Sequence, residues 1–204
     1  MKKFSEIVEG LKITSKSRVN ETYKPKSPEE LALMIKKLVN ERGVDADLND
    51  IDLGYLTDIS FAFQYATKFN GDISRWDVSH IKYMSFLFKG IKFKGDISNW
   101  DVSNVEDMSY MFCNCPFDGD LSKWDVSNVK NMEYMFSGSG FTGTNGDLSN
   151  WDVSNVENMH EMFCGSSFKG NIDNWKTPNV KDTYNMFMGS PLVRKKPKWY
   201  KLVP

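Results

Sequence analysis

The residues of this chain with the clearest chemical potential are aspartates that recur at a fixed spacing. They form two columns, Asp72, Asp96, Asp120 and Asp147 in the first and Asp77, Asp101, Asp125 and Asp152 in the second. Stacked carboxylates attract Ca²⁺, but this ion takes about six to eight oxygen ligands and each aspartate brings too few neighbouring oxygens. We therefore expect the carboxylates to accept hydrogen bonds from the backbone amides of the turns that follow them.

Other groups that act in catalysis or bind metals are few. The chain has three cysteines and two histidines, which do not occur at the spacing of a Cys/His metal site. Cys113, Cys115 and Cys164 are predicted to be free thiols, because none of the pairs suits a disulfide. His160 and Glu161 are the local irregularity with acid–base potential, and their spacing from the flanking methionines puts them on an outer surface. No nucleotide-binding glycine motif is present. We therefore expect no catalytic residues, no metal and no cofactor, and the chain is not predicted to be an enzyme.

The aspartates are positioned by a repeat that is most visible in its tryptophans. The repeated residues are Trp76, Trp100, Trp124, Trp151 and Trp175, at intervals of 24, 24, 27 and 24 residues. A unit of this length cannot bury its own apolar face, so successive copies must stack. Six units are predicted over residues 48–188, with a divergent copy first. The longer interval comes from an insertion between Phe141 and Asp147, which we expect in a loop at one edge of the stack.

Within one unit, the sequence predicts a strand followed by a short helix. The segment from Ile97 to Trp100 is interpreted as a half-buried strand in which apolar and polar residues alternate. Ser103 and Glu106 have the spacing of a capping box, which begins a helix. The inward stripe of that helix is predicted to be Val105, Met108, Met111 and Phe112.

The repeated phrase resembles a known family. The pattern GDISxWDVSNVxxMxxMF is nearly unbroken at residues 95–112, 119–136 and 146–163, and it is similar to the repeat of the BspA-type leucine-rich-repeat family, also called the Mycoplasma-type bacterial surface-protein repeat. The resemblance implies a right-handed solenoid and a role in adhesion and host contact at a bacterial surface. We therefore predict an α/β repeat solenoid, a right-handed leucine-rich-repeat-like stack of about six strand-turn-helix units with a helical N-terminal cap.

Segments outside the units are predicted to cap the stack. Residues 27–47 form an N-terminal capping helix, because Ser27 suits the cap position, Pro28 the first helical position and Glu30 the third. Residues 48–188 form the stack, and residues 189–204 form a basic C-terminal tail with aromatic residues, interpreted as a second cap.

The first residues are harder to assign to a cap. Residues 1–13 are predicted to form an amphipathic helix tethered by a linker at residues 14–26. Its apolar stripe is Phe4, Ile7, Val8 and Leu11. A short helix of this kind cannot bury itself alone. It either folds back on the stack, docks in the groove of a partner or touches a membrane, and we expect it to attach the stack to a larger assembly.

Two further surfaces are candidate binding sites. On the predicted strand face, the variable residues before each tryptophan are Arg75, Asn99, Lys123, Asn150 and Asn174. This polar face is either simply solvated or a ligand surface. The edge loop that carries the insertion is Thr142, Gly143, Thr144 and Asn145, and loops often carry function.

These observations favour a non-enzymatic recognition or adhesion module whose partner is another protein, or else a glycan or host surface component. The alternative is an intracellular or phage-encoded structural component or inhibitor that binds a bacterial or virion protein. The net charge of −1 makes nucleic acid an improbable partner. No apolar run long enough for a transmembrane segment is present. No signal peptide is visible, which favours a cytoplasmic or virion-associated location, whereas the resemblance favours the cell surface. The oligomeric state and the identity of the partner do not follow from the sequence.

Overall fold

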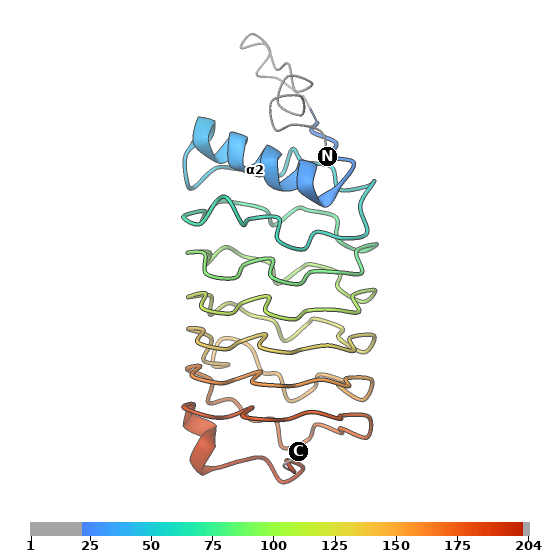
Figure 1. The fold of residues 1–204 in the computed structure, drawn as a ribbon, viewed down its shortest axis with the longest axis vertical. Coiled ribbons are helices and arrows are strands. Elements are labelled where there is room, and N and C mark those ends of the chain that lie inside the picture. The colour runs from blue at the N-terminus through green and yellow to red at the C-terminus, as the bar shows by residue number, and fades with distance from the viewer. Residues whose placement is uncertain (1–21, 202–204) are drawn as a thin grey trace.

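The computed structural model describes residues 22–201. Figure 1 shows the chain as a column of stacked turns, with the helix α2 at one end and the C-terminal segment at the other. Equivalent positions of successive turns are joined by parallel backbone bridges. One row of these bridges links Asp58, Tyr83, Asp107, Asn131, Asn158 and Asp182 in that order.

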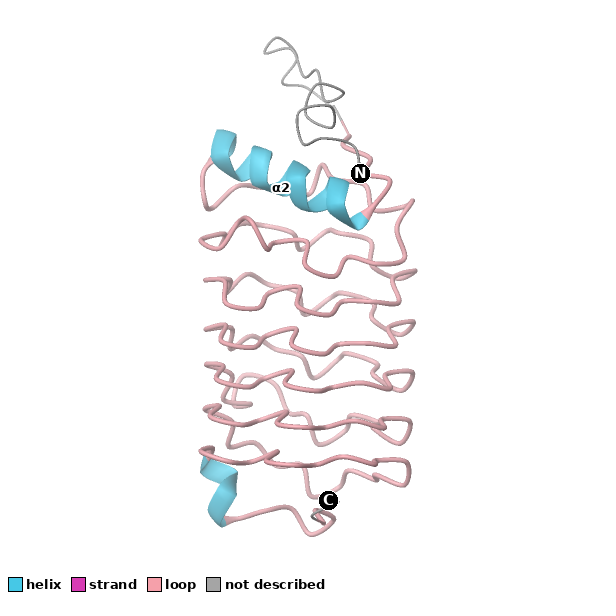
Figure 2. Ribbon diagram, viewed as in Figure 1, coloured by secondary structure: helices cyan, strands magenta, loops and turns pink. Residues whose placement is uncertain are grey.

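The prediction of an α/β repeat solenoid of strand-turn-helix units is wrong. Residues 22–201 contain one α-helix, α2 (Pro28–Arg42), and one short 3-10 helix, η1 (Pro191–Arg194). The bridges between turns are isolated, so this part of the chain has no extended strand and no sheet (Figure 2). The repeating unit is irregular coil and tight turns, and the leucine-rich-repeat-like unit is not observed.

The predicted helix within each unit fails because of its backbone conformation. Tyr110 has a φ of 57°, a left-handed conformation that a right-handed helix cannot contain. Its amide donates to the carbonyl oxygen of Glu133 in the next turn at 2.8 Å, not to a residue in its own turn. The capping box is also absent, since the Ser103 amide donates to the carboxylate of Asp101 at 3.0 Å. The equivalent left-handed residues elsewhere are Phe61, Phe86, Tyr134, Glu161 and Asn185.

The predicted strand fails because its apolar residues are three positions apart. The Trp100 amide donates to the carbonyl oxygen of Ile97 at 3.2 Å, which is the closing hydrogen bond of a β-turn. Ile97 and Trp100 are buried, whereas Ser98 is half-buried and Asn99 is exposed. A strand would bury alternate residues, so the pattern of two buried ends around two outward residues identifies a turn.

Hydrogen bonds between turns replace those of regular secondary structure. The amides of Met108 and Phe112 donate to Asn131 and Met135 of the next turn at 3.0 and 2.9 Å. The intervening Met111 amide donates within its own turn, to Met108 at 3.2 Å. Alternate amides thus donate to the next turn and to their own turn. In this way the coil provides hydrogen bonds for its buried backbone groups without a helix or a strand.

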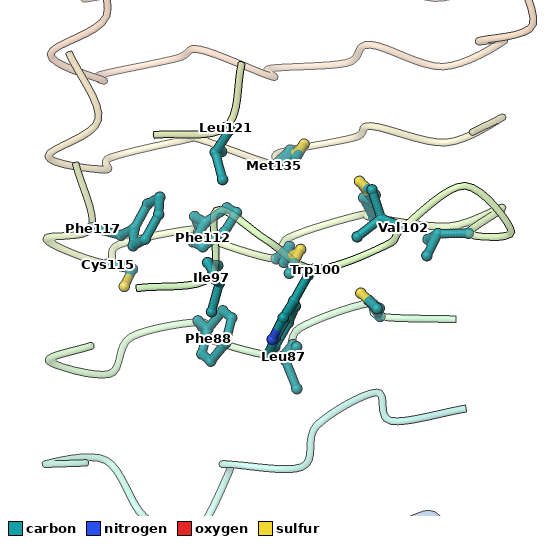
Figure 3. Close-up of a cluster of buried hydrophobic side chains, with 14 of the residues drawn as sticks. Leu87, Phe88, Ile97, Trp100, Val102, Phe112, Cys115, Phe117, Leu121 and Met135 are labelled. Atoms are coloured by element: carbon teal, nitrogen blue, oxygen red, sulfur yellow. The ribbon is translucent and has the colours of Figure 1, made fainter. Parts of the chain in front are cut away.

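The interior is built from columns of aromatic rings. One column contains Phe63, Phe88, Phe112, Phe136, Phe163 and Phe187, with centroids 5.5 to 6.0 Å apart. Figure 3 shows Phe88 and Phe112 from this column packed near Trp100 and Ile97. A column of methionines is also buried and comprises Met84, Met108, Met132 and Met159; Met108 lies in the stripe that was predicted to face inward. Each turn therefore buries its apolar residues against the turns above and below it.

The helix α2 closes the first end of the column. The Ser27 hydroxyl accepts the Glu30 amide at 3.2 Å, Pro28 begins the helix, and Gly43 follows it with a φ of 96°. Leu31, Ile35 and other apolar residues of α2 are buried in the same core as the stacked turns. The helix therefore covers apolar surface that has no preceding turn to cover it.

The C-terminal segment packs on the other end. The indole Nε1 of Trp199 donates to the carbonyl oxygen of Ile172 at 2.6 Å, and its ring stacks on Trp175 with centroids 5.9 Å apart. Trp199 follows Trp175 by 24 residues, so it continues the tryptophan ladder by one position. Tyr200 meets the edge of Phe187 at 5.2 Å. Residues 202–204, which belong to the predicted C-terminal tail, lie outside the described residues.

Candidate functional site

The five variable residues before the tryptophans lie in one exposed row, which we call the exposed column. It comprises Arg75, Asn99, Lys123, Asn150 and Asn174, and all are exposed. Each is the third residue of a β-turn that begins at a buried Ile or Leu and ends at a buried Trp. Successive hydrogen-bonded chain segments lie about 4.8 Å apart, so the column extends over roughly 20 Å. The row thus presents polar side chains of different types on backbone of one repeated geometry.

Each turn of the exposed column is fixed from beneath by its tryptophan. The indole Nε1 of Trp124 donates to the carbonyl oxygen of Ile97, one turn earlier, at 3.1 Å. The corresponding bond from Trp100 reaches Ile73 at 3.2 Å. Because every indole is buried with its N–H satisfied, the turn above it has a defined position.

The first aspartate column fixes the same turns from the side. The carboxylate of Asp120 accepts the amide of Ser122 at 2.8 Å. Hydrogen bonds from the Ser122 amide and hydroxyl lower the pKa of Asp120, and the charge of Lys123 lowers it further. The same arrangement recurs at Asp72, Asp96 and Asp147. The expectation that these carboxylates cap turn amides is confirmed.

The second aspartate column has the same role in the following turn. Asp101 and Asp125 accept the amides of Ser103 and Ser127, each at 3.0 Å. Hydrogen bonds from Ser103 lower the pKa of Asp101. Within residues 22–201, no group of three or more Cys, His, Asp or Glu side chains is arranged to hold a metal ion. The two columns are therefore structural elements that stiffen the surface around the exposed column.

Charge is unevenly distributed along the exposed column. Arg75 pairs with Asp47 at 3.5 Å, and its amide donates to Asn49 at 2.8 Å. It lines an open hollow of about 690 Å³ together with Arg42 and Asp50, which form a bidentate pair. Lys123, in contrast, has no carboxylate within ion-pair distance among the described residues. The middle of the column therefore carries an available positive charge, and its first position does not.

The edge loop is held within the molecule. The amide and hydroxyl of Thr142 donate to the Asp118 carboxylate at 2.7 and 2.8 Å, and the Asn145 side chain donates to the Asp118 carbonyl oxygen at 2.6 Å. The Thr144 hydroxyl lies 2.7 Å from that of Thr142. Gly143 has a φ of 70°, a conformation that favours glycine. The polar groups of this loop are thus largely occupied by Asp118, which makes it a weaker candidate for recognition than the exposed column.

The predicted docking stripe Phe4, Ile7, Val8 and Leu11 lies outside the described residues. The three cysteines are free, as predicted. Burial raises the pKa of Cys115 to about 11, and burial together with a hydrogen bond that the Cys164 thiol donates to the Glu161 carboxylate raises that of Cys164 to about 11. Neither is a thiolate at neutral pH, so these cysteines are poor nucleophiles.

A second surface feature was not anticipated, a row of aromatic side chains at the left-handed positions. Phe61, Phe86, Tyr110 and Tyr134 stack with centroids 4.4 to 4.6 Å apart. The ammonium group of Lys89 lies 4.8 Å from the ring centres of both Phe86 and Tyr110. An aromatic residue recurs at this position of the aligned units, but the position falls within the segments that were predicted to be helices.

A third column, beside the aromatic row, alternates in charge. Its residues are Lys82, Glu106, Lys130, Glu157 and Lys181. Glu106 pairs with Lys130 at 2.7 Å and with Lys82 at 3.4 Å, and Glu157 pairs with Lys181. Aligning the units shows this alternation directly, so it was available from the sequence. These exposed pairs each contribute little to stability. Because lysine and glutamate alternate, this face has no extended patch of one charge.

These features define a class of protein, a repeat protein of stacked coil turns with an aromatic interior and a surface that carries polar columns and one aromatic row. The chain belongs to the family described as Mycoplasma protein of unknown function, DUF285, whose model matches residues 31–141 and again residues 91–199. No curated protein and no solved structure shows significant similarity to the chain. Among residues 22–201, no helix has the length and apolar character needed to cross a membrane.

Proposed function

We propose that this protein is a non-enzymatic protein–protein interaction module of the BspA-like surface-repeat type, and that the exposed column is its recognition surface. The observation that carries the proposal is the contrast within each turn. The buried tryptophan is the same in all five turns, whereas the exposed residue before it is Arg, Asn or Lys.

The geometry of the column supports this role. A row of about 20 Å, with half-buried serines and ordered aspartates beside it, is comparable with one side of a protein interface of standard size. Because indole and carboxylate hydrogen bonds hold the turns in place, binding would cost little ordering of the backbone. The available positive charge at Lys123 and the amides at Asn99 and Asn150 favour a partner surface that offers carboxylate or carbonyl oxygens.

The proposal is tested by affinity capture from the organism that encodes the chain, followed by mass spectrometry. The test variant combines Asn99→Ala, Lys123→Ala and Asn150→Ala, which removes the polar groups from the middle of the column. The control variant combines Lys94→Ala and Lys169→Ala, two exposed lysines outside it. We expect one protein to be retained by the wild type and the control and lost by the test variant.

Two results would contradict the proposal. Equal retention by the test variant would show that the partner binds elsewhere. Recovery of glycan without protein, on the same resin, would show that the surface recognises carbohydrate.

A further inference from the structure

A cleft of about 310 Å³ lies between the start of α2 and the first turn of the stack. Its lining includes the carboxylates of Glu29 and Asp58, the ring of Phe61 and the side chain of Gln64. We call it the first-turn cleft. It is separate from the exposed column, so an inference about it does not depend on the function proposed above.

The first-turn cleft is rich in hydrogen-bond acceptors. In the second turn, the carbonyl oxygens of Tyr83 and Ser85 accept amides from the turn before them, at 3.0 and 3.1 Å. The equivalent carbonyl oxygens in the first turn belong to Asp58 and Ser60, and no amide among the described residues donates to them. The cleft therefore begins where the row of hydrogen bonds between turns ends, and two of its backbone acceptors receive no backbone amide from the described residues.

The cleft also has the charge and the aromatic surface that attract a cation. Its lining residues include two carboxylates and no lysine or arginine. Phe61 and Tyr83, both in the lining, are 42% and 43% exposed, so both side chains are open to solvent. An ammonium group beside an aromatic ring and a carboxylate gains from both the ring face and the opposite charge.

The repeat itself shows what occupies the equivalent place one turn later. Phe61 and Gln64 correspond to Phe86 and Lys89, each 25 residues further along the chain. Lys89 places its ammonium group 4.8 Å from the Phe86 ring centre. In the first turn, Gln64 stands at the position of Lys89, and among residues 22–201 no ammonium group is recorded over the ring of Phe61. The nearby Lys36 lies 5.3 Å from the ring centre of Tyr65, a different ring.

We propose that the first-turn cleft binds a lysine side chain from a basic segment of another protein. The ammonium group would lie against the ring of Phe61, as Lys89 lies against Phe86, with the carboxylates of Glu29 and Asp58 and the open carbonyl oxygens as acceptors. The site is a peptide-recognition site in which an external ammonium group takes the position that Lys89 has in the next turn.

The test uses the full chain and Nα-acetyl-lysine-N-methylamide as the probe, with binding followed by NMR. We expect saturable shifts of the Phe61 ring signals and of the Ser60 and Gln64 amides. Gln64→Lys should fill the cleft with the protein's own ammonium group, and Phe61→Ala should remove the ring. Each should weaken binding by about tenfold or more.

Gln64→Met is the matched control, because it has a similar length and no charge, and it should retain binding. The thermal transition of Gln64→Lys should match that of the wild type, which separates loss of binding from loss of fold. Undiminished binding to Gln64→Lys, or shifts confined to the aspartate columns, would overturn the proposal.

One further arm distinguishes the source of the lysine. The C-terminal segment carries exposed basic residues, namely Arg194, Lys195, Lys196 and Lys198. Sedimentation of the wild type should show a monomer across the concentrations used. Self-association that Gln64→Lys abolishes would mean that a second copy fills the cleft, and the assignment to another protein would be wrong.

Discussion

The tryptophan ladder and the exposed column differ in almost every physical respect although their residues are adjacent in the chain. Trp124 is 3% exposed and stands in a core of stacked rings and aliphatic side chains, whereas the neighbouring Lys123 is exposed and makes no ion pair among the described residues. The ladder holds the spacing of the turns, and the column has no part in it. Of these two neighbours, the tryptophan stabilises the fold and the lysine is available for binding.

The largest effect on stability is expected when one tryptophan of the ladder is removed. Trp124→Ala should lower the free energy of unfolding by about 3 to 5 kcal/mol, because a large buried side chain is lost between two occupied turns. The variant also leaves the Ile97 carbonyl oxygen without its indole donor. Urea denaturation measures the change, and Trp199→Ala serves as the comparison, since Trp199 is only partly buried. An equal loss at both positions would show that position in the ladder does not matter.

A smaller effect is expected from the aspartates that fix the turns. Asp101→Ala should cost about 1 kcal/mol, the contribution of a lost hydrogen bond to the Ser103 amide. Asp101→Asn keeps an acceptor oxygen and should cost less. Asn171, which follows Asp147 in the first aspartate column, accepts the Asp173 amide at 3.0 Å, so an asparagine can cap a turn amide in this way.

The loss at Asp101 should also depend on pH. Hydrogen bonds from the Ser103 hydroxyl and amide lower the pKa of Asp101 in the folded protein below that of an unfolded aspartate, near 3.9. The stabilisation is therefore fully present above about pH 4 and is lost as the pH falls through the lower folded pKa. The difference between wild type and Asp101→Asn should shrink across that range. A difference that stays constant down to pH 2 would argue against charge-assisted capping.

The smallest effect is expected in the exposed column itself. Lys123→Ala should change the free energy of unfolding by less than about 0.5 kcal/mol, because an exposed side chain that makes no ion pair contributes little. The same denaturation series measures it beside Trp124→Ala. A loss of several kcal/mol would mean that the column supports the fold and is not free for recognition.

The sequence was a good guide to burial and a poor guide to backbone. The burial of Trp100 and Met108 and the capping role of Asp120 were predicted correctly, since apolar spacing and turn chemistry recur in the same columns of successive turns. The helix around Tyr110 was predicted because apolar residues three and four apart suit a helical face. The same spacing also suits consecutive β-turns, and the left-handed conformation of Tyr110 cannot be inferred from a residue that rarely adopts it.

In the candidate site, too, exposure was predicted better than backbone structure. The exposure of Asn99 and Lys123 was predicted correctly although the strand that was meant to present them does not exist, since both a strand and a β-turn direct that position outward. The occupation of the Thr142 loop by Asp118 depends on a contact across 24 residues, which no local pattern reveals. The first-turn cleft depends on the absence of a preceding turn, so it became visible only when the stack was assembled.

The forward hydrogen bonds of the turns have a consequence for the length of the molecule. The Tyr110 amide donates to Glu133, and the Tyr134 amide donates to His160. Within residues 22–201, the backbone hydrogen bonds between turns join neighbouring turns only. Removing residues 101–124 would join Trp100 to Asp125 and would bring together partners of the same types as those removed. The distance between the two capped ends can therefore change by the height of one whole turn, and the residues of either cap need not change.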